Sequence, residues 1–178
     1  MNIQELPNEI NQLLEDLNAP SGLRKHLQIV YSTATEIMEF LKKEWPELQL
    51  NETLVLHGAA LHDIGKAEHP EELSEPGNRH VKAGYQLLLE RGYSKKVVRA
   101  VLVHEDWNNP DRSLEELLIS LSDIIWNGIR NNELEEFTIK RIAERTQTDF
   151  WDVYMKMDAI LSEIAEGVDE RLGYQGGS

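Results

Sequence analysis

The segment His62-Asp63-Ile64-Gly65-Lys66 constrains the fold more than any other part of this chain. It directly follows the apolar run 54–61, and a helix there would carry an imidazole and a carboxylate in its last turn. Gly65 stands where many helices end in the left-handed conformation. Burying two polar groups is costly without a partner, and a metal cation is the strongest partner available. An adjacent His and Asp often serve only as a cap or an ion pair, so a metal site is indicated only if other residues of the chain supply further ligands.

Apolar residues recur at helical spacing along most of the chain, and no stretch of useful length alternates in the manner of a strand. Helix starts are indicated by Ser21, Asn51, Ser94 and the capping box Ser113–Glu116. We therefore expect an all-α fold of about seven or eight helices. The expected helices are 3–18, 21–44, one that starts after Asn51, 79–91, one that starts after Ser94 and leads to His104, 114–131, 134–145 and 148–168.

We expect residues 1–178 to form a single domain, with a core of about residues 22–130 and a helical extension over 133–170. The extension would either cover the core or form the face of a homodimer. Residues 67–78 contain two prolines and one glycine and have no helical pattern, so they predict a long loop, and such loops are often functional. The tail Gly173–Ser178 is expected to be flexible.

The composition limits the classes of partner. The chain has 32 acidic and 18 basic residues and a formal net charge of −14, whereas a nucleic-acid-binding face is normally basic, so a nucleic-acid duplex is not an expected partner. No apolar stretch reaches the roughly 18 residues of a membrane span, and the N-terminus lacks the pattern of a signal peptide. We therefore expect a cytoplasmic protein with no membrane partner. Because there is no cysteine, a metal site must use nitrogen and oxygen ligands.

Three histidines and an aspartate accompany the central segment. His26 precedes it, and His80, His104 and Asp123 follow it, each in or at the start of an expected helix. Seven of the ten residues 117–126 are large and apolar, so the carboxylate of Asp123 needs a partner if this helix is buried. An ion pair or a cap would explain any one of these residues alone, but together they favour a set of metal ligands.

The order His … His-Asp … His … His … Asp resembles the HD-domain superfamily of metal-dependent phosphohydrolases over roughly residues 22–130, and the two extra histidines resemble its binuclear members. The resemblance implies one or two divalent metal ions per chain, drawn from Mn, Fe, Co, Ni, Zn and Mg. It assigns one ion to His26, His62, Asp63 and Asp123. It assigns the second ion to His80 and His104, with Asp63 bridging both.

The same resemblance gives Lys66 a role beside Asp63 in catalysis, because the lysine of this motif contacts the substrate phosphate in similar members. The alternative for Lys66 is a solvated charge at a helix end, which the helix dipole also favours. Asn127 and Arg130 follow Asp123 on the expected face of the same helix, and they are further candidates for substrate binding. Arg79, beside His80, is a weaker one. His57 and His69 are expected to bind no metal.

The resemblance implies hydrolysis of a small phosphate ester, a nucleotide or a related phosphomonoester, by a hydroxide shared between two cations. Diiron oxygenases of the same superfamily, such as myo-inositol oxygenase, resemble this ligand set equally well, and a metal-binding regulatory module without turnover is a third possibility. The residues that follow His104, Glu105-Asp106-Trp107, are unlike those of the HD-GYP enzymes. Lys66 replaces the glutamate that resembles the deoxynucleotidase branch, so that activity does not simply transfer.

Overall fold

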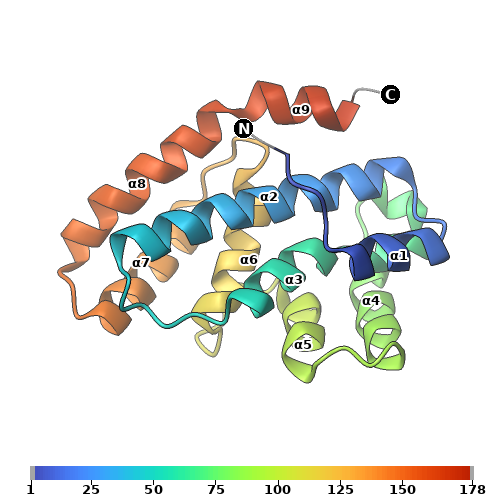
Figure 1. Cartoon of the computed structure of the whole chain (residues 1–178), viewed down its shortest axis with the longest axis horizontal. Coiled ribbons are helices and arrows are strands. Elements are labelled where there is room, and N and C mark those ends of the chain that lie inside the picture. The colour runs from blue at the N-terminus through green and yellow to red at the C-terminus, as the bar shows by residue number, and fades with distance from the viewer. Residues whose placement is uncertain (1–2, 177–178) are drawn as a thin grey trace.

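The longest helix, α2 (Ser21–Glu44), runs through the middle of the molecule, and several other helices pack around it (Figure 1). The computed structural model describes residues 3–176, which contain nine α-helices, two short 3₁₀ helices and no strand. The all-α prediction is therefore confirmed, with slightly more helices than expected. None of the helices in this range is long and apolar enough to cross a membrane. The core face of α2 is formed by buried apolar residues at helical spacing: Leu23, Leu27, Val30, Ala34, Ile37, Met38 and Leu41.

Two helices pack against α2 and against each other, and they complete the central core: α3 (Glu52–Leu61) and α6 (Leu114–Ile125). The Asn51 cap and the Ser113–Glu116 capping box predicted for their first turns are both present. Helix α6 is shorter than expected, because it ends at Ile125 and does not continue to residue 131. The residues after Asp123 therefore do not all share its helix face.

Helices α4 (Arg79–Glu90) and α5 (Lys95–Val103) pack as a pair, and α4 also packs against the 3₁₀ helix η1 (Ile64–Ala67). Gly65 in η1 does not adopt the left-handed conformation that the sequence suggested, since its φ is not positive. A Cβ atom at this position would overlap the backbone carbonyl of His80. Glycine is needed here because η1 approaches α4 closely, and its backbone angle is not the reason.

Residues 67–78, the longest expected loop, contain a second 3₁₀ helix, η2 (Pro70–Leu73), which packs against η1. Together these two short helices lead the chain from the end of α3 to the start of α4. The tight packing of η1 on α4 brings the His62-Asp63 pair close to His80.

The expected extension is formed by α7 (Asn132–Thr146) and α8 (Phe150–Glu166), and a further helix that the sequence did not indicate, α9 (Val168–Gly176), follows it. Helix α9 lies along the N-terminal part of α2 (Figure 1). The expectation of a flexible tail is wrong for 173–176, which are helical, because α9 finds packing partners on α2. Residues 177–178 lie outside the described part of the chain.

Proline at the N-cap position changes two expectations, the start of the first helix and the cap of the second. Helix α1 (Asn8–Asp16) begins after Pro7 and not at residue 3. Helix α2 has Pro20 at its N-cap position, so Ser21 is the first helical residue and its side chain does not act as a cap. Proline at these positions presets a backbone angle that suits the entry to a helix.

Candidate metal centre

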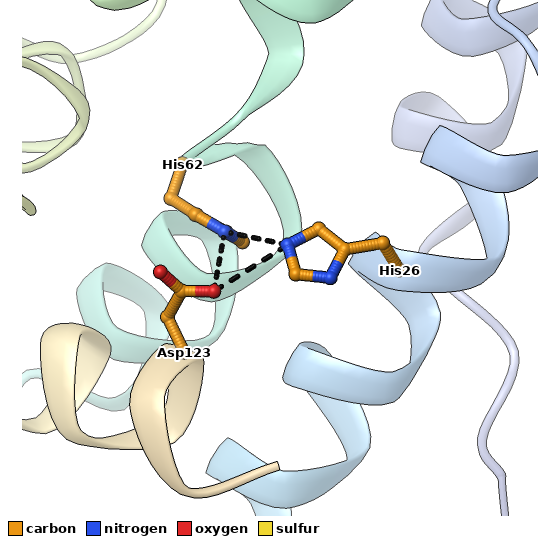
Figure 2. Close-up of side chains that lie close together, drawn as sticks. All are labelled: His26, His62 and Asp123. Carbon is orange, nitrogen blue, oxygen red and sulfur yellow. Dashed lines mark hydrogen bonds and ion pairs between the residues drawn. The ribbon is translucent and has the colours of Figure 1, made fainter. Parts of the chain in front are cut away.

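Three side chains from distant parts of the sequence meet beside the end of α3. His26 comes from α2, His62 stands at the C-cap of α3, and Asp123 comes from α6 (Figure 2). The two imidazole Nε2 atoms lie 3.1 Å apart. The Oδ1 atom of Asp123 lies 3.0 Å from Nε2 of His62 and 3.4 Å from Nε2 of His26. We call these three residues the first trio.

A second trio lies next to it and consists of Asp63, His80 and His104. His80 belongs to the first turn of α4, and His104 stands at the C-cap of α5. Nε2 of His80 lies 3.1 Å from Oδ1 of Asp63, and Nε2 of His104 lies 3.6 Å from the same oxygen. All three residues are buried.

The carboxylate of Asp63 links the two trios, because it turns one oxygen toward each. Its Oδ1 atom faces His80 and His104, and its Oδ2 atom lies 3.3 Å from Nε2 of His26 and 3.6 Å from Nε2 of His62. Ligand atoms held about 2.1 Å from one cation lie about 3.0–3.5 Å from one another. The spacing within the centre therefore fits two cations that share Asp63.

The histidine rings are oriented as metal ligands are. Nδ1 of His62 donates to the carbonyl of Ala59 at 2.9 Å, and Nδ1 of His104 donates to the carbonyl of Val101 at 2.7 Å. A carbonyl oxygen only accepts, so these contacts place the ring proton on Nδ1 and leave the lone pair of Nε2 facing the centre. Nε2 of His80 is buried and has no hydrogen-bond partner among the described residues. A cation would satisfy all of these lone pairs.

The carboxyl and imidazole groups of the centre shift one another's pKa values in directions that favour a bound positive charge. Burial opposes ionisation of Asp63, but His62, His26 and His80 together hold the pKa of this carboxyl well below its usual range. Burial likewise opposes protonation of His26, but its hydrogen bonds to Asp123 and Asp63 raise the pKa of His26 to about 9. Burial and the neighbouring His62 lower the pKa of His104. The Asp63 carboxylate is thus charged and buried, and a metal ion can compensate its charge where a proton otherwise would.

A pocket of about 430 Å³ opens above the centre. Its wall contains residues that the sequence indicated: His26, Asp63, Lys66, His104, Asp123 and Asn127. It also contains residues that no sequence pattern had indicated: Leu73, Glu105, Trp126 and Gln175. The ammonium of Lys66 lies 2.6 Å from Oδ2 of Asp63, so it stands beside the centre.

The model of the HD-domain family matches residues 23–128, which are more than half of the chain and include both trios. The chain belongs to the HD-domain family. This membership supports a metal-dependent phosphohydrolase, and the six His and Asp ligand candidates of the family pattern all lie in the centre.

Two curated relatives of this HD domain are named Ribonuclease Y. The one from Sulfurovum sp. (strain NBC37-1) is 30% identical over 112 residues, which cover 61% of this chain and 21% of the relative. The one from Acidothermus cellulolyticus (strain ATCC 43068 / DSM 8971 / 11B) is 35% identical over 104 residues, which cover 55% of this chain and 20% of the relative. The HD domain thus spans about a fifth of the length of these relatives. No solved structure matches the chain.

Glu72 supports the second trio, although the sequence did not mark it as a site residue. One of its carboxylate oxygens accepts from Nδ1 of His80 at 2.7 Å and from the His80 amide at 3.1 Å. Burial opposes its ionisation, but hydrogen bonds from His80 and Arg79 lower the pKa of Glu72 to about 2. A Cβ atom at Gly77 would overlap the Glu72 side chain, so this glycine makes room for it. The one feature of the sequence that could have pointed to Glu72 is its position in the long loop 67–78.

The structure does not bring Arg130 to the pocket. Because α6 ends at Ile125 and Gly128 has a φ of +83°, the chain turns away before Arg130. The guanidinium instead donates to Glu135 at 2.8 and 2.7 Å and to Asp158 at 2.7 Å. Arg130 therefore joins the start of α7 to α8.

Three other residues considered in the sequence lie away from the pocket wall. Arg79 has a side chain that is 62% exposed and forms ion pairs with Glu71 and Glu72. His57 lies 3.6 Å from a carboxylate oxygen of Glu9, and His69 lies 3.4 Å from one of Glu71. The candidate metal clusters among the described residues do not include His57 or His69.

Proposed function

We propose that this HD domain is a metal-dependent phosphohydrolase that acts on a small phosphate ester, a nucleotide or a related phosphomonoester. The observation that carries the proposal is the position of Asp63, which turns one oxygen toward each trio at the floor of a pocket that Lys66 also lines. A single carboxylate placed in this way suits a pair of cations that act on one phosphoryl group.

Two divalent cations, when bound, would activate a water molecule and polarise the phosphate oxygens. The protein side chains supply the rest. Burial holds Asp63 in place, and hydrogen bonds together with burial hold the rings of His62, His80 and His104. The ammonium of Lys66 stands at the pocket wall, where it would neutralise charge that grows on the phosphoryl oxygens.

The charge distribution favours a small substrate. Lys66 is the one lysine or arginine in the described wall of the pocket, and the chain as a whole carries a net charge of −14. A polymer with a phosphate at every nucleotide is normally met by a basic surface of several residues. The volume of about 430 Å³ is within the range of pockets for small molecules, which is about 300–1,000 Å³.

The name of the relatives supports a second candidate, the cleavage of a phosphodiester bond in RNA. Those relatives are called Ribonuclease Y, and the segment that they share with this chain is only about a fifth of their own length. A phosphate monoester carries up to two negative charges on its oxygens, whereas a diester carries one and has a second ester group. Testing a monoester beside the matching diester therefore separates the two candidate functions.

The test is a substrate panel with purified protein loaded with Mn²⁺. The panel contains p-nitrophenyl phosphate, bis-p-nitrophenyl phosphate, the four ribonucleoside 5′-monophosphates and a short single-stranded RNA. We expect release of inorganic phosphate from the monoesters. Cleavage of the diester and the RNA alone would replace our proposal with the second candidate.

A second part of this experiment distinguishes the phosphohydrolase from the oxygenase alternative by its dependence on oxygen. Protein loaded with Fe²⁺ is incubated with the same panel, and with myo-inositol, in air and without oxygen. A phosphohydrolase releases phosphate equally well in both. Oxygen consumption that depends on an added polyol, together with no phosphate release, would overturn the proposed function.

A further inference from the structure

The two ions of the centre would be held by unequal sets of ligand atoms. The first ion faces four atoms: Nε2 of His26, Nε2 of His62, Oδ2 of Asp63 and Oδ1 of Asp123. The second faces three atoms: Nε2 of His80, Nε2 of His104 and Oδ1 of Asp63. The first ion thus has the carboxylate of Asp123 to itself, whereas the second has only a share of Asp63.

The carboxylate of Glu105 lies beside the second trio. Glu105 lines the same pocket as Asp63 and His104. Its Oε1 atom is 3.7 Å from Nε2 of His80, the nitrogen that is buried and has no hydrogen-bond partner among the described residues. Two ligand atoms that are each about 2.1 Å from one cation lie at most about 4.2 Å apart. The position of Glu105 therefore suits a cation that it shares with His80.

Hydrogen bonds fix the backbone on both sides of Glu105. The hydroxyl of Ser120 in α6 donates to the carbonyl of His104 at 2.7 Å. The guanidinium of the buried Arg112 donates to the carbonyl of Asp106, also at 2.7 Å. The side chain of Glu105 is itself 53% exposed, so packing does not hold its carboxylate in one position. The backbone thus places Glu105 at the second trio, and the carboxylate can turn toward a cation.

The charge of the second ion also favours a further carboxylate. Two neutral imidazoles and one shared carboxylate leave most of the charge of a divalent cation uncompensated in a buried site. Divalent Mn and Mg bind carboxylate oxygens readily. A carboxylate from Glu105 would balance the second ion as Asp123 balances the first.

We propose that Glu105 is a ligand of the second ion, in addition to the six His and Asp candidates of the family pattern. The inference rests on the metal centre and not on the reaction, so it holds for whichever substrate the centre takes. Metal affinity therefore tests it without any turnover.

The test titrates metal-free wild type and Glu105→Gln with Mn²⁺ and follows the free ion by electron paramagnetic resonance. Glutamine keeps the size of the side chain but replaces a charged ligand with a neutral amide. We expect the Kd of the second ion to rise at least about 10-fold and that of the first to change less than about twofold. His104→Ala removes a ligand of the second ion alone, so it identifies which binding step belongs to that ion.

The matched control is Glu68→Gln, which removes the same charge at the exposed C-cap of η1. Glu68 does not line the pocket above the centre, so we expect neither Kd to change. A general effect of lost negative charge would instead weaken both ions, and it would appear in both variants. Circular dichroism checks that each variant is folded.

The same proteins, assayed for phosphate release, keep this inference separate from the proposed function. If wild type binds two ions and Glu105→Gln weakens only the second, while no ester is hydrolysed, the proposed function is wrong and the role of Glu105 stands. If phosphate is released but Glu105→Gln binds both ions as wild type does, the inference is wrong and the proposed function stands. Equal weakening of both ions, the same weakening in Glu68→Gln or a single ion in wild type would each overturn the inference as well.

Discussion

The two trios of the metal centre are built from different kinds of structure. The first trio is held by packed helices, with His26 inside α2 and Asp123 inside α6, and the Asp123 side chain is 26% exposed at the pocket. The second trio is more deeply buried, with the side chains of His80 and His104 each no more than 2% exposed. Its His80 ring is held by a carboxylate from the loop that precedes α4.

This difference indicates which ion would respond to which change. The helices that carry the first trio, α2, α3 and α6, pack together in the core, and this packing also fixes the positions of the three side chains. The orientation of His80 in the second trio depends on Glu72, so a change at one loop residue should weaken that ion alone. Asp63, a member of the second trio, also turns an oxygen toward the first, so its loss should affect the two ions together.

The largest effect is expected for Asp63→Ala, because it removes the carboxylate that faces both trios. Both ions should be lost or bound far more weakly, and phosphate release should fall to background. Metal analysis after gel filtration measures the first effect, and Asp16→Ala, a surface carboxylate on α1, is the matched control. Wild-type metal content in Asp63→Ala would contradict a shared ligand.

The next effect is expected for Lys66→Ala, which leaves both trios complete. If the ammonium stabilises the transition state, kcat should fall about 10²–10³-fold while both ions stay bound. Lys66→Arg should restore little, since a planar guanidinium on a longer stem places its charge differently. Lys82→Ala on α4 is the control. Equal kcat values for wild type and Lys66→Ala would make Lys66 only a solvated charge near Asp63.

A smaller effect, confined to the second trio, is expected for Glu72→Gln. The carboxamide oxygen can still accept from Nδ1 of His80, but its NH2 group then faces the donors of Arg79 and the negative charge is lost, so the ring is held less firmly. We expect the affinity for the second ion to fall about 10–100-fold and that for the first to change little. Titration with Mn²⁺ followed by electron paramagnetic resonance resolves the two steps. Glu71→Gln is the control, and equal weakening of both steps would argue against separate trios.

The smallest effect on the centre is expected for Arg130→Met, although the protein should become less stable. The substitution leaves the largely buried carboxylate of Glu135 without its partner, and we expect the free energy of unfolding to fall by about 1–3 kcal/mol. KM for a phosphate ester should change less than about twofold, because the guanidinium faces α7 and α8. Urea unfolding and steady-state kinetics measure these quantities. A tenfold rise in KM in the folded variant would place Arg130 at the substrate after all.

Local patterns in the sequence were enough for the all-α class and for the helix caps at Asn51, Ser94 and Ser113. Helical spacing and capping act between residues a few positions apart, so they can be read from the chain. The predicted start of α1 and the predicted Ser21 cap of α2 were wrong, because Pro7 and Pro20 take the cap positions, whereas the range 21–44 expected for α2 is confirmed. The helical extension was indicated as well, but α9, a short and polar segment that packs on α2 and α8, was not.

The sequence by itself also indicated the six ligand candidates, through the order of His and Asp residues in which it resembles the HD-domain pattern. Only the tertiary structure decided how these six residues are divided between two trios, with Asp63 turned toward both. It also decided that Glu72 contacts His80, that Gln175 lines the pocket and that Arg130 does not. The physical reason is that these contacts join segments far apart in the chain. Their side-chain directions follow from where helices end and how they pack, which no local pattern encodes.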